Sequence, residues 1–119
     1  MKKEDKELLF KDICARLPYK VKVSYHDNEN ERQECDVIDS IYEDTQEIGV
    51  EQWCLKMDKF KPYLFPMSSM TEKQIAQIEF WVFMKEYHKI TDFYYENHID
   101  FRCLIEKGLA IDCTNLNIY

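Results

Sequence analysis

The 119-residue chain is poor in residues that form sharp turns, with only two glycines and three prolines. Gly49 and Gly108 are isolated, which excludes the glycine-rich loops that hold phosphates in nucleotide-binding folds. The five cysteines form no CxxC pair, and none of the Cys and His spacings typical of zinc sites occurs. We therefore expect no metal and no cofactor, and we expect each cysteine to be a reduced, buried, small hydrophobic residue.

Long apolar runs are also missing. The longest run, Phe80–Met84 (FWVFM), is too short to span a membrane, and no apolar signal segment follows the charged N-terminus Lys2–Lys6. The length and the hydrophobic content of 45% suit a single domain over residues 1–119 with a core of its own. These features predict a cytoplasmic protein with no membrane partner.

Clustered basic charge is a third absence, because the formal net charge is −7. A polynucleotide partner would need a surface rich in Lys and Arg, so we exclude it. Residues 27–51 contain ten acids and one base, so this segment carries 1 − 10 = −9 and the rest carries −7 + 9 = +2. We interpret the segment either as a solvated face or as a nucleic-acid-mimicking hairpin that binds a basic protein through Glu29, Glu31, Glu34 and Asp36.

The clearest helix start lies at Thr71. Thr71 followed by Gln74 fits a capping box, and Met70 with Ile75 fits a hydrophobic staple. Apolar residues then recur at helical spacing, and the FWVFM run makes the helix apolar nearly all round. We predict a central helix that packs on the sheet and is buried on more than one side. An alternative is that part of this aromatic run forms the interface of a homodimer or lines a ligand pocket.

Strand signals are concentrated in the first half of the chain. Residues 19–25 (YKVKVSY) alternate between apolar and polar, which predicts a half-buried strand. Residues 34–42 fit the returning strand, with a break at Asp39 that indicates a bulge or a register change, and residues 47–50 fit a third short strand. Residues 51–61 fit either a strand or a helical turn, and we favour a strand that enters a turn.

Further helices are expected at residues 3–17, 88–97 and 100–107, the last capped by Asp100. The apolar residues 109–113 predict an added edge strand. The predicted fold class is therefore α+β: a small antiparallel sheet of three to four strands with an N-terminal helix, a central helix and short C-terminal helices.

The most suggestive polar cluster surrounds Arg102. An arginine can hold a phosphate or carboxylate with two donors, and Tyr and Trp faces can stack on a base. We therefore predict a site for a small anionic, nucleotide-type ligand, formed by Arg102, His98, Tyr94, Tyr95 and Trp81. The alternative is structural: Asp100 caps a helix, Arg102 forms a salt bridge and the tyrosines pack in the core.

Lys56, Lys59 and Lys61 form a second basic group, which is either an anion-binding patch or a solvated face. Catalytic residues are not predicted, because no Ser, Cys or His stands in a recognisable arrangement of nucleophile and base. We therefore expect a non-enzymatic binding protein, with an acidic inhibitor module as the alternative and an uncharacterised small enzyme as the second alternative.

Three stretches, KDICARLPYKVKV, KPYLFPMSSMTEKQ and ENHIDFRCLIEKGLAIDCTNLNIY, resemble a family of small uncharacterised proteins from Bacteroides-type gut bacteria, their phages and prophages. The family pattern in the last stretch is His-His-Phe-Asp-Tyr-Arg-Gly, whereas here Ile99 replaces an aromatic residue and Cys103 replaces the glycine. The resemblance implies a phage or mobile-element accessory protein in the bacterial host cytosol, and it carries no established activity. Such an origin favours interference with host defence, including capture of small nucleotide signals.

Overall fold

The computed structural model describes residues 1–27, 32–51 and 53–119. Within them the chain forms three α-helices and eight strands, so the predicted α+β class is confirmed. No helix in this described part is both long and apolar enough to cross a membrane. The helices are α1 (Lys3–Arg16), α2 (Glu72–Phe83) and α3 (Tyr87–Glu96).

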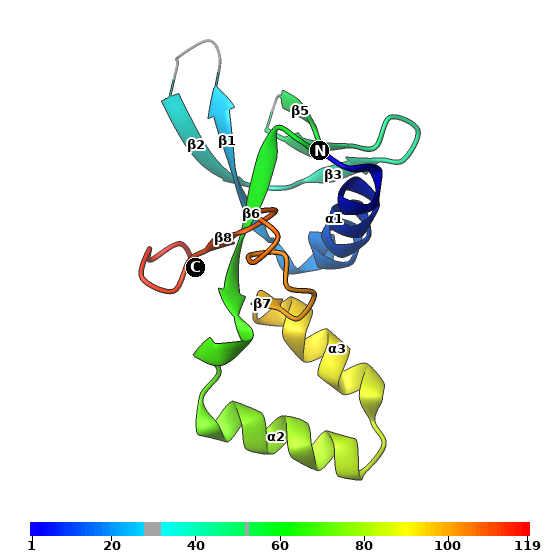
Figure 1. Ribbon diagram of the computed structural model, residues 1–119, viewed down its shortest axis with the longest axis vertical. Coiled ribbons are helices and arrows are strands. Elements are labelled where there is room, and N and C mark those ends of the chain that lie inside the picture. The colour runs from blue at the N-terminus through cyan, green and yellow to red at the C-terminus, as the bar shows by residue number, and fades with distance from the viewer. Residues whose placement is uncertain (28–31, 52) are drawn as a thin grey trace.

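The strands form two sheets (Figure 1). In the first, β1 pairs antiparallel with β2 and β6, whereas β7 and β8 pair parallel with β6. The second is an antiparallel meander, β3-β4-β5. The strands predicted in the first half are therefore present, but they belong to two sheets, and one of these is mixed. The bounds are β1 (Lys22–Asp27), β2 (Arg32–Val37), β3 (Ser40–Tyr42), β4 (Glu47–Val50), β5 (Trp53–Lys56), β6 (Phe60–Pro66), β7 (Ile99–Asp100) and β8 (Ile111–Asp112).

The chain passes from the first sheet to the second at Asp39. The Ile38 N–H donates to the Val21 carbonyl beside β1 at 3.1 Å, and the Asp39 N–H donates to the Gly49 carbonyl on β4 at 2.9 Å. The irregularity predicted at Asp39 is thus a change of sheet rather than a bulge. A β-carbon at Gly49 would lie 2.1 Å from Ser40 Oγ, so a larger residue there would force the Ser40 side chain to move.

Strand β6 lies at the centre of the first sheet. Its residues 60–62 pair with β1, residues 63–64 with β8 and residues 65–66 with β7. The two sheets, α1 and the segment after β7 share one apolar core, whose fully buried members include Leu9, Ile13, Val21, Val23, Ile48, Val50, Leu64 and Leu104.

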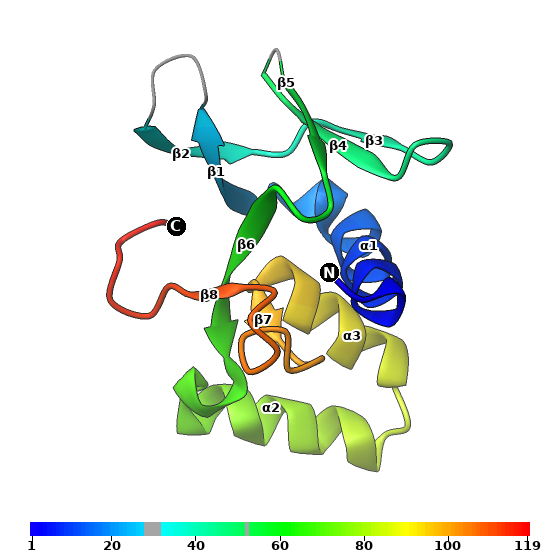
Figure 2. The ribbon, with the colours of Figure 1, turned by 45° about the horizontal axis from the view of Figure 1, so that its top comes forward.

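Helix α2 starts as predicted but is not buried. Thr71 Oγ1 accepts from the Gln74 N–H at 3.2 Å, and Gln74 Oε1 accepts from the Thr71 N–H at 2.9 Å, which completes the capping box. However, none of its 12 residues, all within the described part, is buried, and Val82 is 49% exposed. Figure 2 shows α2 at one end of the molecule, beside α3 and beyond the end of β6. The helix is therefore present, but the prediction that it is buried on the sheet is wrong, because α1, through Leu9 and Ile13, packs there instead.

The C-terminal segment also differs from its prediction. Residues 101–107 form turns rather than a helix. Asp100 is therefore not a helix cap, and its buried carboxylate instead accepts from the Leu104 and Ile105 N–H groups of these turns, at 2.8 and 2.9 Å. Gly108 adopts a φ of +75° just before the predicted added strand, which is β8.

The five cysteines, all among the described residues, are free thiols. Cys113 is buried, and burial raises the pKa of its thiol to about 11. Cys35, Cys54 and Cys103 are exposed, so the prediction of five buried small hydrophobic residues is wrong for these three.

Candidate functional site

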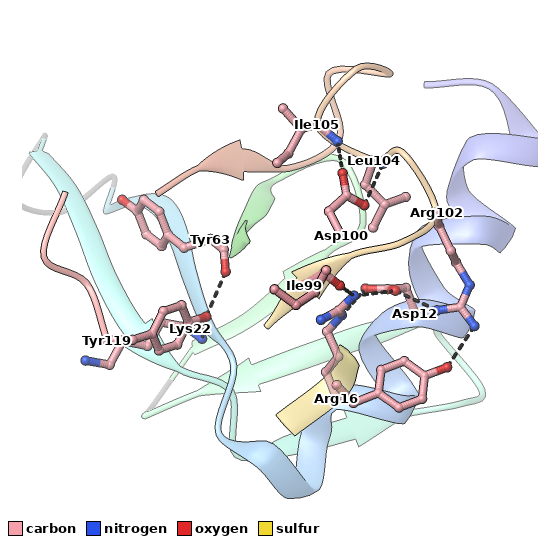
Figure 3. A network of polar contacts seen from close by, with 11 residues as sticks. Asp12, Arg16, Lys22, Tyr63, Ile99, Asp100, Arg102, Leu104, Ile105 and Tyr119 are labelled. Carbon is pink, nitrogen blue, oxygen red and sulfur yellow. Dashed lines mark hydrogen bonds and ion pairs between the residues drawn. The ribbon is translucent and has the colours of Figure 1, made fainter. Parts of the chain in front are cut away.

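Arg102 belongs to a buried ionic cluster on α1 (Figure 3). Its Nη1 donates to Asp12 Oδ1 at 2.6 Å, and Arg16 Nε donates to Asp12 Oδ2 at 2.6 Å. Arg16 Nη2 also donates to the Ile99 carbonyl at 2.6 Å. The side chains of Asp12 and Arg16 are 0% exposed and that of Arg102 is 14% exposed. Two cations therefore share one carboxylate inside the protein.

Aromatic rings enclose this cluster. Arg102 Nη2 donates to the Tyr95 hydroxyl at 2.9 Å, and the Arg102 guanidinium lies 4.4 Å from the Phe101 ring centroid. Burial alone would lower the pKa of Arg102, but the hydrogen bonds to Tyr95 and Asp12 raise it above its ordinary value. The fork that would hold a phosphate is thus directed at Asp12 and Tyr95, as the structural alternative predicts.

His98 faces Tyr119. The two rings stack with centroids 3.7 Å apart and planes 11° apart. The Tyr119 hydroxyl accepts from the Lys22 N–H at 2.9 Å and donates to the Tyr63 carbonyl at 2.8 Å, so it bridges β1 and β6 (Figure 3). Burial, together with the charges of Arg16 and Lys22, lowers the pKa of His98 to about 4. The imidazole is therefore neutral at pH 7.

Tyr94 and Trp81 belong to one chain of aromatic contacts. Tyr94 stacks on Phe101 with centroids 5.1 Å apart, and it also meets Phe93 edge-on at 6.4 Å. Trp81 on α2 meets the same Phe93 edge-on at 5.9 Å. Of the predicted ligand residues, Arg102, Tyr94 and Tyr95 therefore gather around Phe101, Trp81 joins them only through Phe93, and His98 stacks on Tyr119 instead.

Two of the four acidic residues predicted to bind a partner lie in the described part, and both contact other side chains of the first sheet. Glu34 forms an ion pair with Arg32, and Asp36 accepts a hydrogen bond from the Tyr25 hydroxyl. Burial and this hydrogen bond raise the pKa of Tyr25. The other two residues of this prediction, which lie outside the described part, are Glu29 and Glu31.

A cavity of about 470 Å³ is lined by residues of both sheets. Its volume is within the usual range for small-molecule sites. Strand β1 contributes Tyr25, His26 and Asp27, and the second sheet contributes Glu47, Trp53, Cys54, Leu55 and Lys56. Lys59, in the turn between β5 and β6, completes the lining. We call this space the Trp53 cavity.

Every residue of β5 borders this cavity. Trp53 and Leu55 are half-buried, whereas Cys54 and Lys56 are exposed. Lys56 stands opposite Glu47 in the β4–β5 ladder, so residues of both charge signs border the cavity. Trp53, two lysines and the acids Asp27 and Glu47 therefore surround one space.

A second cavity, also of about 470 Å³, shares His26 and Lys59 with the first. Lys61 lines it as well, opposite Ser24 in the β1–β6 ladder. All three lysines of the predicted second basic group therefore line one or both cavities. Trp53 borders the first cavity and His26 borders both, and neither residue was assigned to a site from the sequence. The alternation in residues 53–57 was the available signal, and only the packing of the two sheets places β5 across a cavity from β1.

Among the described residues, no group of three His, Cys, Asp or Glu side chains is arranged to hold a metal ion. No family model, no curated protein and no solved structure matches the chain.

Proposed function

We propose that the protein is a non-enzymatic binding protein that holds a small anionic ligand of the nucleotide type in the Trp53 cavity. The observation that supports this best is that Trp53, Lys56 and Lys59 border one space of about 470 Å³. Sites for small molecules typically combine apolar lining with a few polar groups that fix orientation.

Four of the lining residues have defined roles in this proposal. The Trp53 ring stacks on the base, because every base has a π-face. Lys56 and Lys59 neutralise the phosphate as mobile point charges. Glu47 accepts a hydrogen bond from an N–H or O–H group of the base or the sugar. The second cavity, bordered by Lys59 and Lys61, accommodates a further phosphate.

The anion-binding role falls to the lysines rather than to Arg102. A ligand at Arg102 would have to displace Asp12, which is fully buried and also holds Arg16. Separating a buried ion pair is costly, because the abandoned charge has no water around it. Lys56 and Lys59 are exposed, so a ligand can reach them without disturbing the core.

The proposal includes a biological setting. As the product of a phage or mobile element, the protein sequesters a nucleotide signal in the cytosol of the bacterial host and so interferes with defence. Capture needs no chemistry on the ligand, which agrees with the absence of a catalytic signature in the sequence.

Tryptophan fluorescence tests the proposal directly, because the chain has only two tryptophans. The Trp81→Phe variant leaves Trp53 as the sole indole. Titration of this variant with mono-, di- and cyclic nucleotides at low salt should produce a saturable change in Trp53 emission. A thermal-shift assay on the unaltered chain provides a second readout, because a ligand at 100 times its Kd adds about 2.7 kcal/mol of stability.

Two lysine substitutions locate the site. Lys59→Ala should weaken binding about tenfold or more, the size of one lost charge-assisted hydrogen bond. Lys11→Ala removes an exposed lysine from α1 and should leave the affinity unchanged. The proposal fails if no nucleotide alters either signal, or if Lys59→Ala binds as tightly as Lys11→Ala. Pull-downs at two salt concentrations would then test the acidic segment against basic proteins.

A further inference from the structure

Helix α2 presents an exposed apolar surface. Phe80, Phe83 and Met84 are 55%, 81% and 50% exposed, and Tyr87 at the start of α3 is 58% exposed. Residues three and four positions apart are neighbours on a helix, so the side chains on α2 form a continuous strip. We call these four residues the α2 outer face. Figure 2 shows that α2 forms an end of the molecule.

The opposite side of α2 packs on α3. Ile78 and Trp81 are half-buried, and Trp81 meets Phe93 of α3. At about 100° per residue, Phe80 and Phe83 lie across the helix from Ile78. A helix of 12 residues is marginal in water, and its stability in a protein comes from packing. Contact on one side leaves most of the apolar surface of α2 in solvent.

The size of the exposed surface matches the centre of a protein interface. The rings of Phe80, Phe83 and Tyr87 together present roughly 400 Å², given the area that an aromatic side chain can bury. Met84, 50% exposed and four residues after Phe80, widens the patch on the same side. A typical interface buries about 800 Å² on each partner, with an apolar centre and a polar rim. The α2 outer face can therefore supply the apolar centre of such an interface.

We propose that the α2 outer face binds the same face of a second copy of this chain across a twofold axis. A symmetric dimer requires a self-complementary patch. Ala76, Phe80 and Phe83 are four and three residues apart, which is the spacing of a helix–helix seam, and the small Ala76 leaves room for a ring of the partner helix.

Charge also favours a second copy at this face. Residues 72–89 contain three acids and three bases, so their sum is 3 − 3 = 0, whereas the whole chain carries −7. Two acidic molecules therefore meet at a region with no net charge. The strands of the acidic segment lie at the other end of the molecule (Figure 1), where repulsion between copies is weakest after pairing. The Trp53 cavity is also at that end, beside β5, so pairing leaves it open.

Light scattering after size-exclusion chromatography tests the dimer. The unaltered chain should elute with a mass of twice 14.5 kDa, and Phe83→Glu should elute as a single chain. Tyr42→Glu is the matched control, because it places the same charge at a ring that is 45% exposed on β3, and it should remain a dimer. Circular dichroism checks that both variants are folded.

Urea unfolding gives a second readout that does not depend on elution. The unfolding midpoint of the unaltered chain should rise with protein concentration, and that of Phe83→Glu should not, because only a dimer gains stability by mass action. A monomeric unaltered chain at high concentration overturns the proposal, as does a dimer that survives Phe83→Glu. If Tyr42→Glu dissociated the dimer, the interface would lie away from α2, and the proposal would again be overturned. Ligand binding at Trp53 is measured separately and does not affect this outcome.

Discussion

Helices α1 and α2 reverse the usual relation between composition and burial. Helix α1 has the sequence KEDKELLFKDICAR, rich in charge, yet Leu9, Asp12, Ile13 and Arg16 are fully buried in it. Helix α2 ends in the apolar run FWVF, yet none of its 12 residues, all of them described, is buried. Whether a helix is buried therefore depends on what packs against it and on whether its polar groups find partners, not on its average hydrophobicity.

The charged pair of α1 is buried because partners far along the chain complete it. Asp12 holds Arg16 one turn away and Arg102 from the C-terminal segment, and Arg16 also reaches the Ile99 carbonyl. Paired, hydrogen-bonded charges can be buried where single charges cannot. In contrast, α2 offers apolar side chains on all sides, and only one side can face α3.

Loss of the carboxylate that Arg16 and Arg102 share should reduce stability more than any other change in α1 or α2. Asp12→Ala leaves two arginines without their anion in the core, so we expect a loss of about 3–5 kcal/mol in the free energy of unfolding. Urea denaturation measures it, with Glu7→Ala, an exposed acid on the same helix, as the control. A loss no larger than that of the control would show that the cluster contributes nothing.

His98, which lies near the buried charge of Arg16, should make stability depend on pH, with an effect of intermediate size. Burial, Arg16 and Lys22 hold the pKa of His98 at about 4, below its ordinary value of 6.5. Between these values the unfolded chain binds a proton that the folded chain does not, so stability is full above pH 6.5 and falls as the pH drops toward 4. Urea midpoints at pH 7 and pH 5 should differ less in His98→Asn than in the unaltered chain. Equal differences would contradict the assignment.

The smallest loss of stability should come from a substitution at an exposed residue of α2. Val82→Ala should change stability by no more than about 0.5 kcal/mol in the monomeric Phe83→Glu background, because Val82 is 49% exposed. The same substitution at the fully buried Val23 should cost about 1–3 kcal/mol in that background. Thermal or urea unfolding of the two variants compares them directly. Equal losses would mean that α2 is buried as the sequence pattern predicts.

Features fixed by neighbouring residues were predictable from the sequence. The capping box at Thr71 depends on residues three positions apart, and the break at Asp39 marks the change of sheet. The alternation of Val21, Val23 and Tyr25 correctly indicated their buried side. In each case the physical cause lies within a few residues of the chain.

The remaining features depend on contacts between distant segments. Apolar periodicity alone cannot tell whether α1 or α2 covers the sheets, because both faces are compatible with burial. The partners of Arg102 lie on α1 and at Tyr95, so its role as a structural ion is visible only in the fold. The Trp53 cavity needs β5 beside the end of β1, and no local pattern encodes that approach.

The ionic cluster also constrains the order in which the chain folds. Arg16 and Ile99 are 83 positions apart, and Asp12 and Arg102 are 90 positions apart. During synthesis α1 leaves the ribosome before the C-terminal segment, so its buried charges find their partners only when residue 102 has emerged. Contacts of such large sequence separation slow folding, because a long loop must close before they form. The packing of α1 is therefore completed long after the helix itself has been made.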